Sequence, residues 1–269
     1  MIVANTAQPV GVFDSGVGGL TVVNKLRHLL PHEDIVYLGD TKRNPYGIRT
    51  REEILSFTRE IVAFLAGQHV KLIAFACNTA TATAYDTVIN ETDIPLLGMS
   101  RGIKTAKDTT TEKRIAVFAT PLTIANHIHK KEAEKTDPFL TIVEQPCASL
   151  AGLIERGKLD GPEIREAVRD DVAPVLKARV NTAIFGCTHY PFVRHIFEEL
   201  CGESVVFVDP AHETALQALA VLKKKNLLNT QRRPGYLHLC FTAEAGRGAA
   251  LASELISPEE FTAAEVSLT

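Results

Sequence analysis

Two cysteines occupy corresponding places in two similar stretches of the sequence. In "LIAFACNTA" an apolar run ends at Cys77, and in "TAIFGCTHY" a similar run ends at Cys187. Each thiol is followed at once by two side chains that can form hydrogen bonds: Asn78 and Thr79 in the first stretch, Thr188 and His189 in the second. Parallel α/β proteins hold their ligands at the carboxyl ends of strands, so both thiols are candidates for chemistry.

Two thiols that approach a carbon from opposite sides suit one reaction in particular. One thiolate removes a proton from one face of the carbon, and the other thiol returns a proton to the opposite face. A free thiol has a pKa of roughly 8.5, so the thiolate needs support from its surroundings. A strand that leads directly into a helix supplies this support through backbone N–H groups and the positive end of the helix dipole.

The other three cysteines, Cys147, Cys201 and Cys240, are expected to pack in the core, as free cysteines commonly do. The same structural role is the alternative for Cys77 and Cys187. The odd number of thiols, their wide spacing and the lack of a CxxC pair argue against a disulfide framework. The same pattern argues against a zinc site built from close cysteine pairs, and we expect no metal.

A glycine-rich turn, "DSGVGG", follows the apolar run "VGVF". Its glycines do not match the GxGxxG spacing and no GK[ST] follows, so dinucleotide and Walker-type phosphate binding are poorly supported. The glycines would let the backbone approach a small carboxylate. Asp14 at the end of the run could bind an amino group or assist a thiol, or it could simply cap the following helix.

The elements around these residues alternate between apolar strands and helices of period 3.6. Strands are predicted at 9–14, 34–40, 70–77, 114–120, 180–187 and 204–210, with a shorter one near 94–99 and another near 140–146. Thr50 and Glu53 have the spacing of a capping box before one helix. This alternation predicts an α/β fold with mostly parallel, doubly wound sheets. The repeated strand–cysteine design further suggests two related halves that face each other.

Composition excludes several classes of protein. The chain has 269 residues, 45% of them hydrophobic, and a net charge of −3 without a long basic block. Nucleic acid is therefore not an expected partner. The start of the sequence lacks the pattern of a signal peptide, and no apolar run reaches the length of a membrane span. We expect no membrane association and a cytoplasmic location.

Several motifs taken together resemble the glutamate racemases of the aspartate/glutamate racemase superfamily. In order along the chain they are "FDSGVGGLTV", "YLGD", "NPYGIR", "ACNTAT", "ATPLT", "GLIERG", "GCTHYP", "VDP" and, near the end, "CFTAEA". The resemblance implies cofactor-independent racemisation of glutamate for peptidoglycan synthesis. It also implies two similar α/β domains related by a pseudo-twofold axis, with the substrate between them. The first domain would comprise 1–99 and 210–269, and the second 100–209. A homodimer is compatible with the resemblance, as is a monomer.

The resemblance also implies roles for individual residues. Cys77 would act on the D-glutamate face of the substrate and Cys187 on the L-glutamate face. Asp14 and His189 would assist the thiols, and Glu155 would lie near the reacting groups. The substrate would be bound by Asp14, Ser15, Tyr46, Gly47, Asn78, Thr79, Thr123, Thr188 and His189.

The sequence departs from the family pattern in three places, and other functions stay open. "GMSRG" is shorter than usual, His129 replaces an expected tyrosine, and "CASLAGLIERG" lacks two prolines. An aspartate racemase of the same fold is the nearest alternative function. A non-catalytic carboxylate-binding or regulatory protein would bind a ligand without exchanging its Cα proton. A thiol oxidoreductase would instead form a reversible Cys77–Cys187 disulfide.

Overall fold

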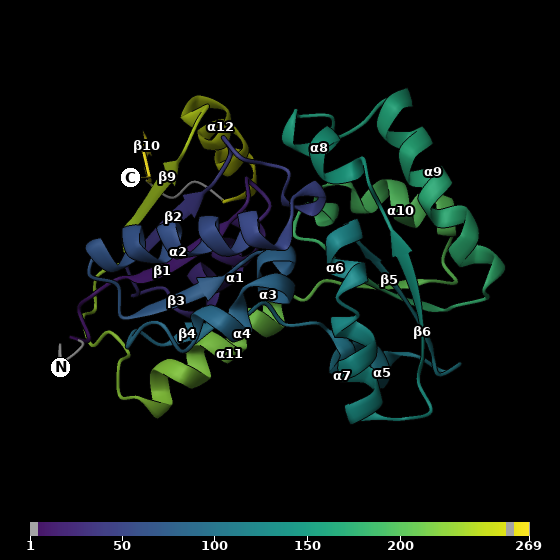
Figure 1. The fold of residues 1–269 in the computed structure, drawn as a ribbon, viewed down its shortest axis with the longest axis horizontal. Coiled ribbons are helices and arrows are strands. Elements are labelled where there is room, and N and C mark those ends of the chain that lie inside the picture. Colours follow the sequence, from purple (N-terminus) through teal and green to yellow (C-terminus); the bar gives the residue numbers. More distant parts are fainter. Residues whose placement is uncertain (1–4, 257–260, 269) are drawn as a thin grey trace. The chain divides into compact units, whose positions relative to one another are not determined.

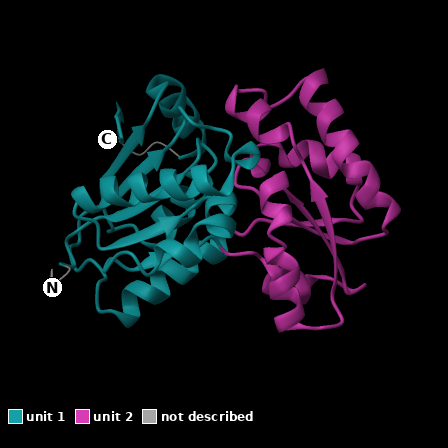
Figure 2. Ribbon diagram, in the orientation of Figure 1, with its two compact units in different colours: residues 1–99, 211–269 teal, residues 100–210 magenta. Residues whose placement is uncertain are grey.

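The computed structural model describes residues 5–256 and 261–268, and the chain forms two compact units (Figures 1 and 2). Unit 1 comprises 1–99 and 211–269, and unit 2 comprises 100–210. Unit 1 is therefore built from two separate segments of the chain, whereas unit 2 is continuous.

Unit 1 is built around a six-stranded sheet in which every strand pair is parallel. The strand order is β10-β9-β2-β1-β3-β4. The strands are β1 (Val10–Asp14), β2 (Ile35–Gly39), β3 (Leu72–Phe75), β4 (Leu96–Leu97), β9 (Leu237–Phe241) and β10 (Thr262–Glu265). The residues of β1, β2 and β3 are all buried, which explains their unbroken apolar sequences.

Helices cover both faces of this sheet. The connection from β1 to β2 runs toward one edge and that from β2 to β3 runs toward the other, so right-handed crossovers place their helices on opposite faces. Accordingly α1 packs against α11 and α12, while α2 packs against α3 and α4. The helices of unit 1 are α1 (Leu20–Leu29), η1 (Tyr46–Ile48), α2 (Arg51–Gly67), α3 (Asn78–Thr83), α4 (Tyr85–Val88), α11 (Ala211–Lys224) and α12 (Ala245–Leu255).

Unit 2 repeats this plan with a four-stranded parallel sheet of order β6-β5-β7-β8. Phe118 and Phe185 belong to one apolar cluster and Val117 and Ile184 to another, so successive residues of β5 and β7 pack on opposite faces. The strands are β5 (Arg114–Ala119), β6 (Thr141–Pro146), β7 (Thr182–Gly186) and β8 (Val206–Val208). The helices are α5 (Ile103–Thr109), α6 (Pro121–Ala125), α7 (Ile128–Thr136), α8 (Leu150–Glu155), α9 (Pro162–Lys177), η2 (Tyr190–Val193) and α10 (Arg194–Cys201).

The α/β class and the parallel sheets predicted from the sequence are confirmed. The capping box at Thr50 and Glu53 is also present, with both reciprocal hydrogen bonds formed. Helix α9 runs unbroken through Pro174. Of the helices in the described part of the chain, none combines the length and apolar character that a membrane crossing requires.

A buried ion pair connects four segments at the amino-terminal end of the unit 1 sheet. Lys71 and Glu33 have side chains that are 0% and 2% exposed, and Lys71 Nζ lies 2.5 Å from Glu33 Oε2. Lys71 Nζ also donates to the carbonyl of Thr6, and Glu33 Oε1 accepts from the N–H of Asn229. The pair therefore joins the segments that lead into β1, β2 and β3 to the segment that follows α11.

His129 on α7 makes the stability of unit 2 depend on pH. The ring is fully buried, and neither nitrogen has a hydrogen-bond partner in the described residues. Burial, helped by the charge of Arg101, lowers the pKa of His129 from 6.5 to about 3. Below pH 6.5 the unfolded chain therefore binds a proton at His129 that the folded chain does not bind. The free energy of unfolding consequently falls as the pH falls.

We expect His129→Leu to remove this dependence. Between pH 7 and pH 5 the free energy of unfolding of the wild type should fall by about 2 kcal/mol relative to the variant. Urea unfolding at the two pH values measures the difference. Parallel pH profiles for His129→Leu and the wild type would show that His129 is protonated without cost.

Candidate active site

In unit 1 the strand that ends at Asp14 lies beside the strand that leads to Cys77. Phe13 of β1 is in register with Phe75 of β3, and the N–H of Ala76 donates to the carbonyl of Phe13. The connection after β1 runs toward one edge of the sheet and the connection after β3 toward the other. The carboxyl ends of β1 and β3 therefore flank the topological switch point, where open α/β sheets bind ligands.

The turn after β1 is shaped by the buried carboxylate of Asp14. Asp14 Oδ2 accepts from the N–H of Gly19 at 2.9 Å. A side chain at Gly19 would place its Cβ only 2.7 Å from the Cβ of Asp14, so this close approach requires glycine. Ser15, the next residue in the turn, is also buried, and its hydroxyl and carbonyl oxygens both lie within hydrogen-bond distance of Asn44 Nδ2.

Cys77 is the residue that caps α3. Its Sγ accepts from the N–H of Ala80 at 3.5 Å, and the thiol is almost fully buried. Asn78 and Thr79 are buried beside it at the start of the helix. Asn78 Nδ2 has no hydrogen-bond partner in the described residues, which leaves a buried donor on the residue that follows Cys77. A thiolate and a carboxylate are both favoured by such donors.

Tyr46 and Gly47 are buried at the start of η1, a short 3-10 helix that contacts α3. The Tyr46 hydroxyl donates to Asp40 Oδ2 at 2.5 Å. Burial and the charge of Asp40 hold the pKa of Tyr46 well above its ordinary value, so the hydroxyl remains a neutral donor. The seven candidate residues of unit 1 are thus brought together: Asp14, Ser15, Tyr46, Gly47, Cys77, Asn78 and Thr79.

In unit 2 the equivalent strands are β5 and β7. Ala119 at the end of β5 is in register with Gly186 at the end of β7, and Cys187 follows directly. The switch point again lies between these two strands, because the connections after β5 and β7 run toward opposite edges. After β5, Thr120 caps α6, and its hydroxyl lies 2.9 Å from that of the fully buried Thr123.

Three side chains form a buried polar chain at the end of β7. Cys187 Sγ lies 3.7 Å from His189 Nδ1, and His189 Nε2 lies 2.7 Å from Glu155 Oε2 at the end of α8. Burial by itself lowers the pKa of His189, but its hydrogen bonds to Cys187 and Glu155 outweigh this and raise the pKa well above 6.5. The charged imidazolium is therefore favoured over the neutral imidazole. As an imidazolium it donates from both nitrogens, to the cysteine sulfur and to the carboxylate.

Thr188 lies buried between Cys187 and His189 and completes the unit 2 set. The candidates gathered in unit 2 are thus Thr123, Glu155, Cys187, Thr188 and His189.

The three other cysteines are buried in surroundings that favour the neutral thiol. Burial raises the pKa of Cys201 and of Cys240 to about 11. Burial also raises the pKa of Cys147 well above its usual range, and the carboxylate of Asp171 adds to the effect. These environments fit the packing role that the sequence predicts for them.

Asp40 and Thr242 are polar residues beside the unit 1 site for which no role was predicted from the sequence. The Thr242 hydroxyl donates to Asp40 Oδ1 at 2.8 Å across 202 positions of sequence. Both residues lie in motifs that carry the family resemblance, "YLGD" and "CFTAEA". Membership of these motifs was the feature of the sequence that could have indicated a role for them.

The chain matches the family model described as Asp/Glu/hydantoin racemase over residues 19–218. It is 37% identical over 260 residues to the glutamate racemase of Lactobacillus helveticus, covering 96% of this chain and 97% of that protein. The crystal structure of a glutamate racemase isoform from Bacillus anthracis superposes with a TM-score of 0.91 at 31% identity, covering 98% of this chain and 99% of that one. A glutamate racemase from Francisella tularensis, solved in complex with D-glutamate, superposes with a TM-score of 0.86 at 30% identity and 98% coverage of each chain.

The fold, its two switch-point cysteines and these matches define the class of protein: the chain belongs to the Asp/Glu/hydantoin racemase family. It is accordingly an enzyme of the isomerase class. The relatives reported above carry the more specific name of glutamate racemase.

Glu155→Gln is expected to lower the pKa of His189, because glutamine provides an acceptor without the negative charge. The ring signals of His189 in an NMR titration should then move at lower pH than in the wild type. Exposed Glu166 on the neighbouring helix α9 provides the control, Glu166→Gln, which should leave the titration unchanged. An unshifted titration in Glu155→Gln would mean that the carboxylate does not hold the proton on His189.

The same substitution has a consequence for stability. A raised folded-state pKa stabilises the protein fully below the unfolded value near 6.5, and this contribution is lost as the pH rises through the folded pKa. Glu155→Gln should therefore lower the free energy of unfolding at pH 6 by more than at alkaline pH.

Proposed function

We propose that this chain interconverts L-glutamate and D-glutamate without a cofactor, using Cys77 and Cys187 as the two acid/base groups. The observation that carries the proposal is the repeated placement of a buried cysteine at the switch point of each parallel sheet, together with hydrogen-bonding side chains. The names of the relatives, and the D-glutamate bound to the Francisella tularensis structure, support glutamate as the substrate.

In the proposed reaction each cysteine serves one face of the substrate. Cys77 removes the Cα proton of D-glutamate as a thiolate, and Cys187 as a thiol delivers a proton to the opposite face. The roles are exchanged in the reverse direction. Asp14 assists Cys77, and His189 assists the proton transfers of Cys187 through Nδ1, which lies 3.7 Å from the sulfur. Glu155 favours the charged form of His189.

Loss of the Cα proton places negative charge beside the α-carboxylate, and the chain must stabilise this charge with prearranged donors. Asn78 Nδ2 supports such a role because it is a buried donor without a partner in the described residues. We assign substrate binding to it together with Ser15, Tyr46, Gly47, Thr79, Thr123, Thr188 and His189. We further propose a cytoplasmic enzyme whose D-glutamate enters peptidoglycan synthesis.

The test is to incubate the purified, reduced protein with L-glutamate in D2O without added cofactor. Loss of the Cα–H NMR signal and decay of optical activity are followed together, and the assay is repeated with D-glutamate and L-aspartate. Exchange and racemisation of both glutamate enantiomers are expected. Activity on aspartate alone would reassign the substrate. Binding of glutamate without Cα–H exchange would replace the racemase by a binding protein.

A further inference from the structure

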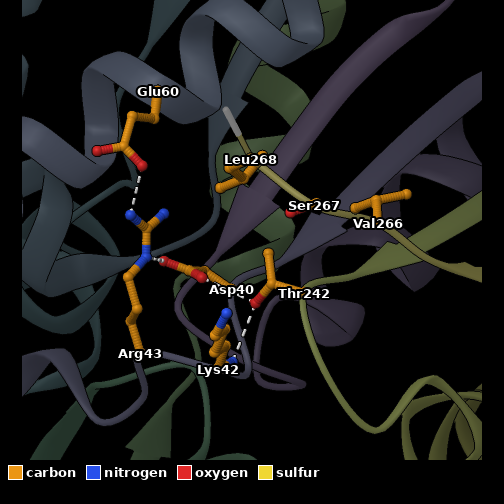
Figure 3. A pocket seen from close by; sticks show the side chains of 8 residues that line it. All are labelled: Asp40, Lys42, Arg43, Glu60, Thr242, Val266, Ser267 and Leu268. Carbon is orange, nitrogen blue, oxygen red and sulfur yellow. Dashed lines mark hydrogen bonds and ion pairs between the residues drawn. The ribbon is translucent and has the colours of Figure 1, made fainter.

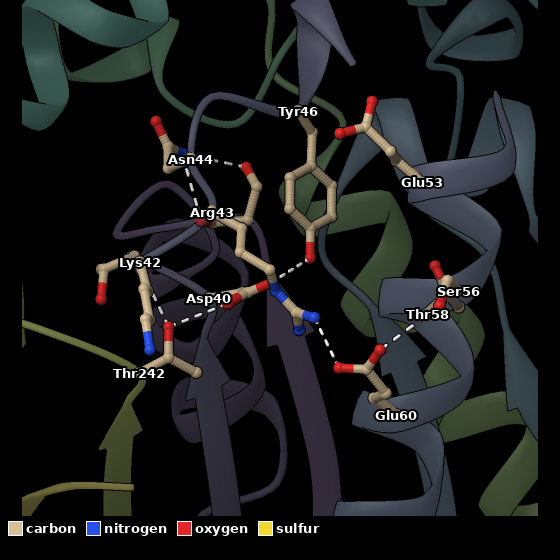
Figure 4. A network of polar contacts seen from close by, with 12 residues as sticks. Asp40, Lys42, Arg43, Asn44, Tyr46, Glu53, Ser56, Thr58, Glu60 and Thr242 are labelled. Atoms are coloured by element: carbon tan, nitrogen blue, oxygen red, sulfur yellow. Dashed lines mark hydrogen bonds and ion pairs between the residues drawn. The ribbon is translucent and has the colours of Figure 1, made fainter. Parts of the chain in front are cut away.

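Two of the motifs that carry the family resemblance, "YLGD" and "CFTAEA", have no part in the reaction proposed above. The structure brings them together at Asp40, the residue that follows β2 (Figure 4). Asp40 has a fully buried side chain, and its N–H donates to the carbonyl of Asp14 at 2.9 Å. This buried carboxylate therefore lies directly beside the candidate site residue Asp14.

Three side-chain donors converge on this carboxylate. Arg43 Nε donates to Oδ2 at 2.6 Å, and the Tyr46 hydroxyl donates to the same oxygen at 2.5 Å. Thr242, at the end of β9, donates to Oδ1 at 2.8 Å. Asp40 thus links the candidate substrate-binding residue Tyr46 to two neighbouring strands of the unit 1 sheet.

Further contacts hold the loop that follows β2 on both of its sides. On the β9 side, Lys42 N–H donates to the Thr242 hydroxyl, and Thr41 exchanges hydrogen bonds with Ala243. On the α2 side, the Arg43 guanidinium lies 2.5 Å from Glu60 Oε2 and 4.1 Å from the centre of the Phe57 ring. Asp40 is the point at which the two sets of contacts meet.

A cavity of about 140 Å³ lies beside these contacts (Figure 3). Its charged lining residues are Asp40, Lys42, Arg43 and Glu60. Two positive and two negative side chains favour neither an anion nor a cation, so the cavity does not indicate a ligand.

We propose that Asp40 is a positioning residue that acts through Tyr46 to fix the substrate-binding turn at Tyr46 and Gly47. Because the Tyr46 hydroxyl is hydrogen-bonded to Asp40, Tyr46 contacts the substrate through its backbone. The hydrogen bond from its hydroxyl to Asp40 holds the Tyr46 side chain in place, and with it the backbone of the turn at Tyr46 and Gly47.

This proposal rests on the proposed racemase function, and its test uses a double-mutant cycle. Asp40→Asn keeps the shape of the side chain but removes its charge, and Tyr46→Phe removes the hydroxyl. Each substitution should raise KM for glutamate about tenfold with kcat changed less than about threefold, because a contact made equally in the ground and transition states is weakened. The double variant should be no worse than either single variant. Additive effects, or an unchanged KM in Asp40→Asn, would overturn the proposal.

A second measurement does not depend on activity. Trypsin cleaves after Lys42, Arg43 and Arg49, so limited proteolysis reports how firmly this loop is held. Cleavage there should be faster in Asp40→Asn than in the wild type. Glu91→Gln is the matched control, since it disrupts an exposed ion pair with Arg59 in the same unit. Unchanged cleavage in Asp40→Asn would count against the positioning role. Wild-type protein that fails to racemise glutamate would contradict the proposed function instead.

Discussion

Replacing Cys187 by alanine is expected to lower the rate of glutamate racemisation by roughly 10³-fold or more, because one of the two proton-transfer groups is lost. The remaining thiol of Cys77 can still remove a proton from D-glutamate and return one to the same face. In D2O the Cys187→Ala variant should therefore exchange the Cα proton of D-glutamate without inverting it, and L-glutamate should stay unlabelled. Cys77→Ala should show the opposite preference.

NMR of the two enantiomers, incubated separately with each variant, measures this exchange. Cys201→Ala is the matched control, because Cys201 is a buried thiol of unit 2 whose raised pKa keeps it neutral. This control should racemise both enantiomers. A single-cysteine variant that exchanged both enantiomers equally would be incompatible with one thiol for each face.

Lys71→Met is expected to destabilise unit 1 by about 3–5 kcal/mol, because it leaves the buried carboxylate of Glu33 without its cation. Adding Glu33→Gln should recover a large part of the loss, since glutamine can still accept from the N–H of Asn229 without carrying a charge. Urea unfolding followed by circular dichroism gives the free energies. Hydrogen exchange of the β1 and β2 amides assigns the loss to unit 1.

The exposed pair of Arg59 and Glu91 offers the comparison at the surface of the same unit. Arg59→Met should leave the unfolding midpoint nearly unchanged, because water and salt screen such pairs. Equal effects of Lys71→Met and Arg59→Met would show that burial does not set the strength of the Lys71–Glu33 pair.

Local sequence patterns were sufficient to predict the strands that form the candidate site. The runs that end at Asp14, Cys77 and Cys187 are apolar throughout because their strands are buried on both faces, and a polar residue marks where each strand ends. The likeness between the two cysteine stretches corresponds to equivalent strands, β3 and β7, which occupy equivalent places in the two sheets.

Contacts between distant segments could not be predicted in this way. No strand was predicted at 237–241 or 262–265, because His238 interrupts the apolar run of β9 and β10 is largely exposed. Without β9, nothing in the sequence places Thr242 beside Asp40. The burial of His129 was equally hidden, since a histidine within a charged helix such as α7 gives no indication that it faces the core.

The position of β9 between β2 and β10 also bears on how the molecule is made. A ribosome releases 100–210 as one uninterrupted stretch, so unit 2 has all its strands available before synthesis ends. The unit 1 sheet is completed later in synthesis, because one of the two strand partners of β2 is encoded about 200 residues further along the chain, at Leu237–Phe241. The nascent chain therefore contains all four strands of the unit 2 sheet before it contains β9 and β10 of the unit 1 sheet.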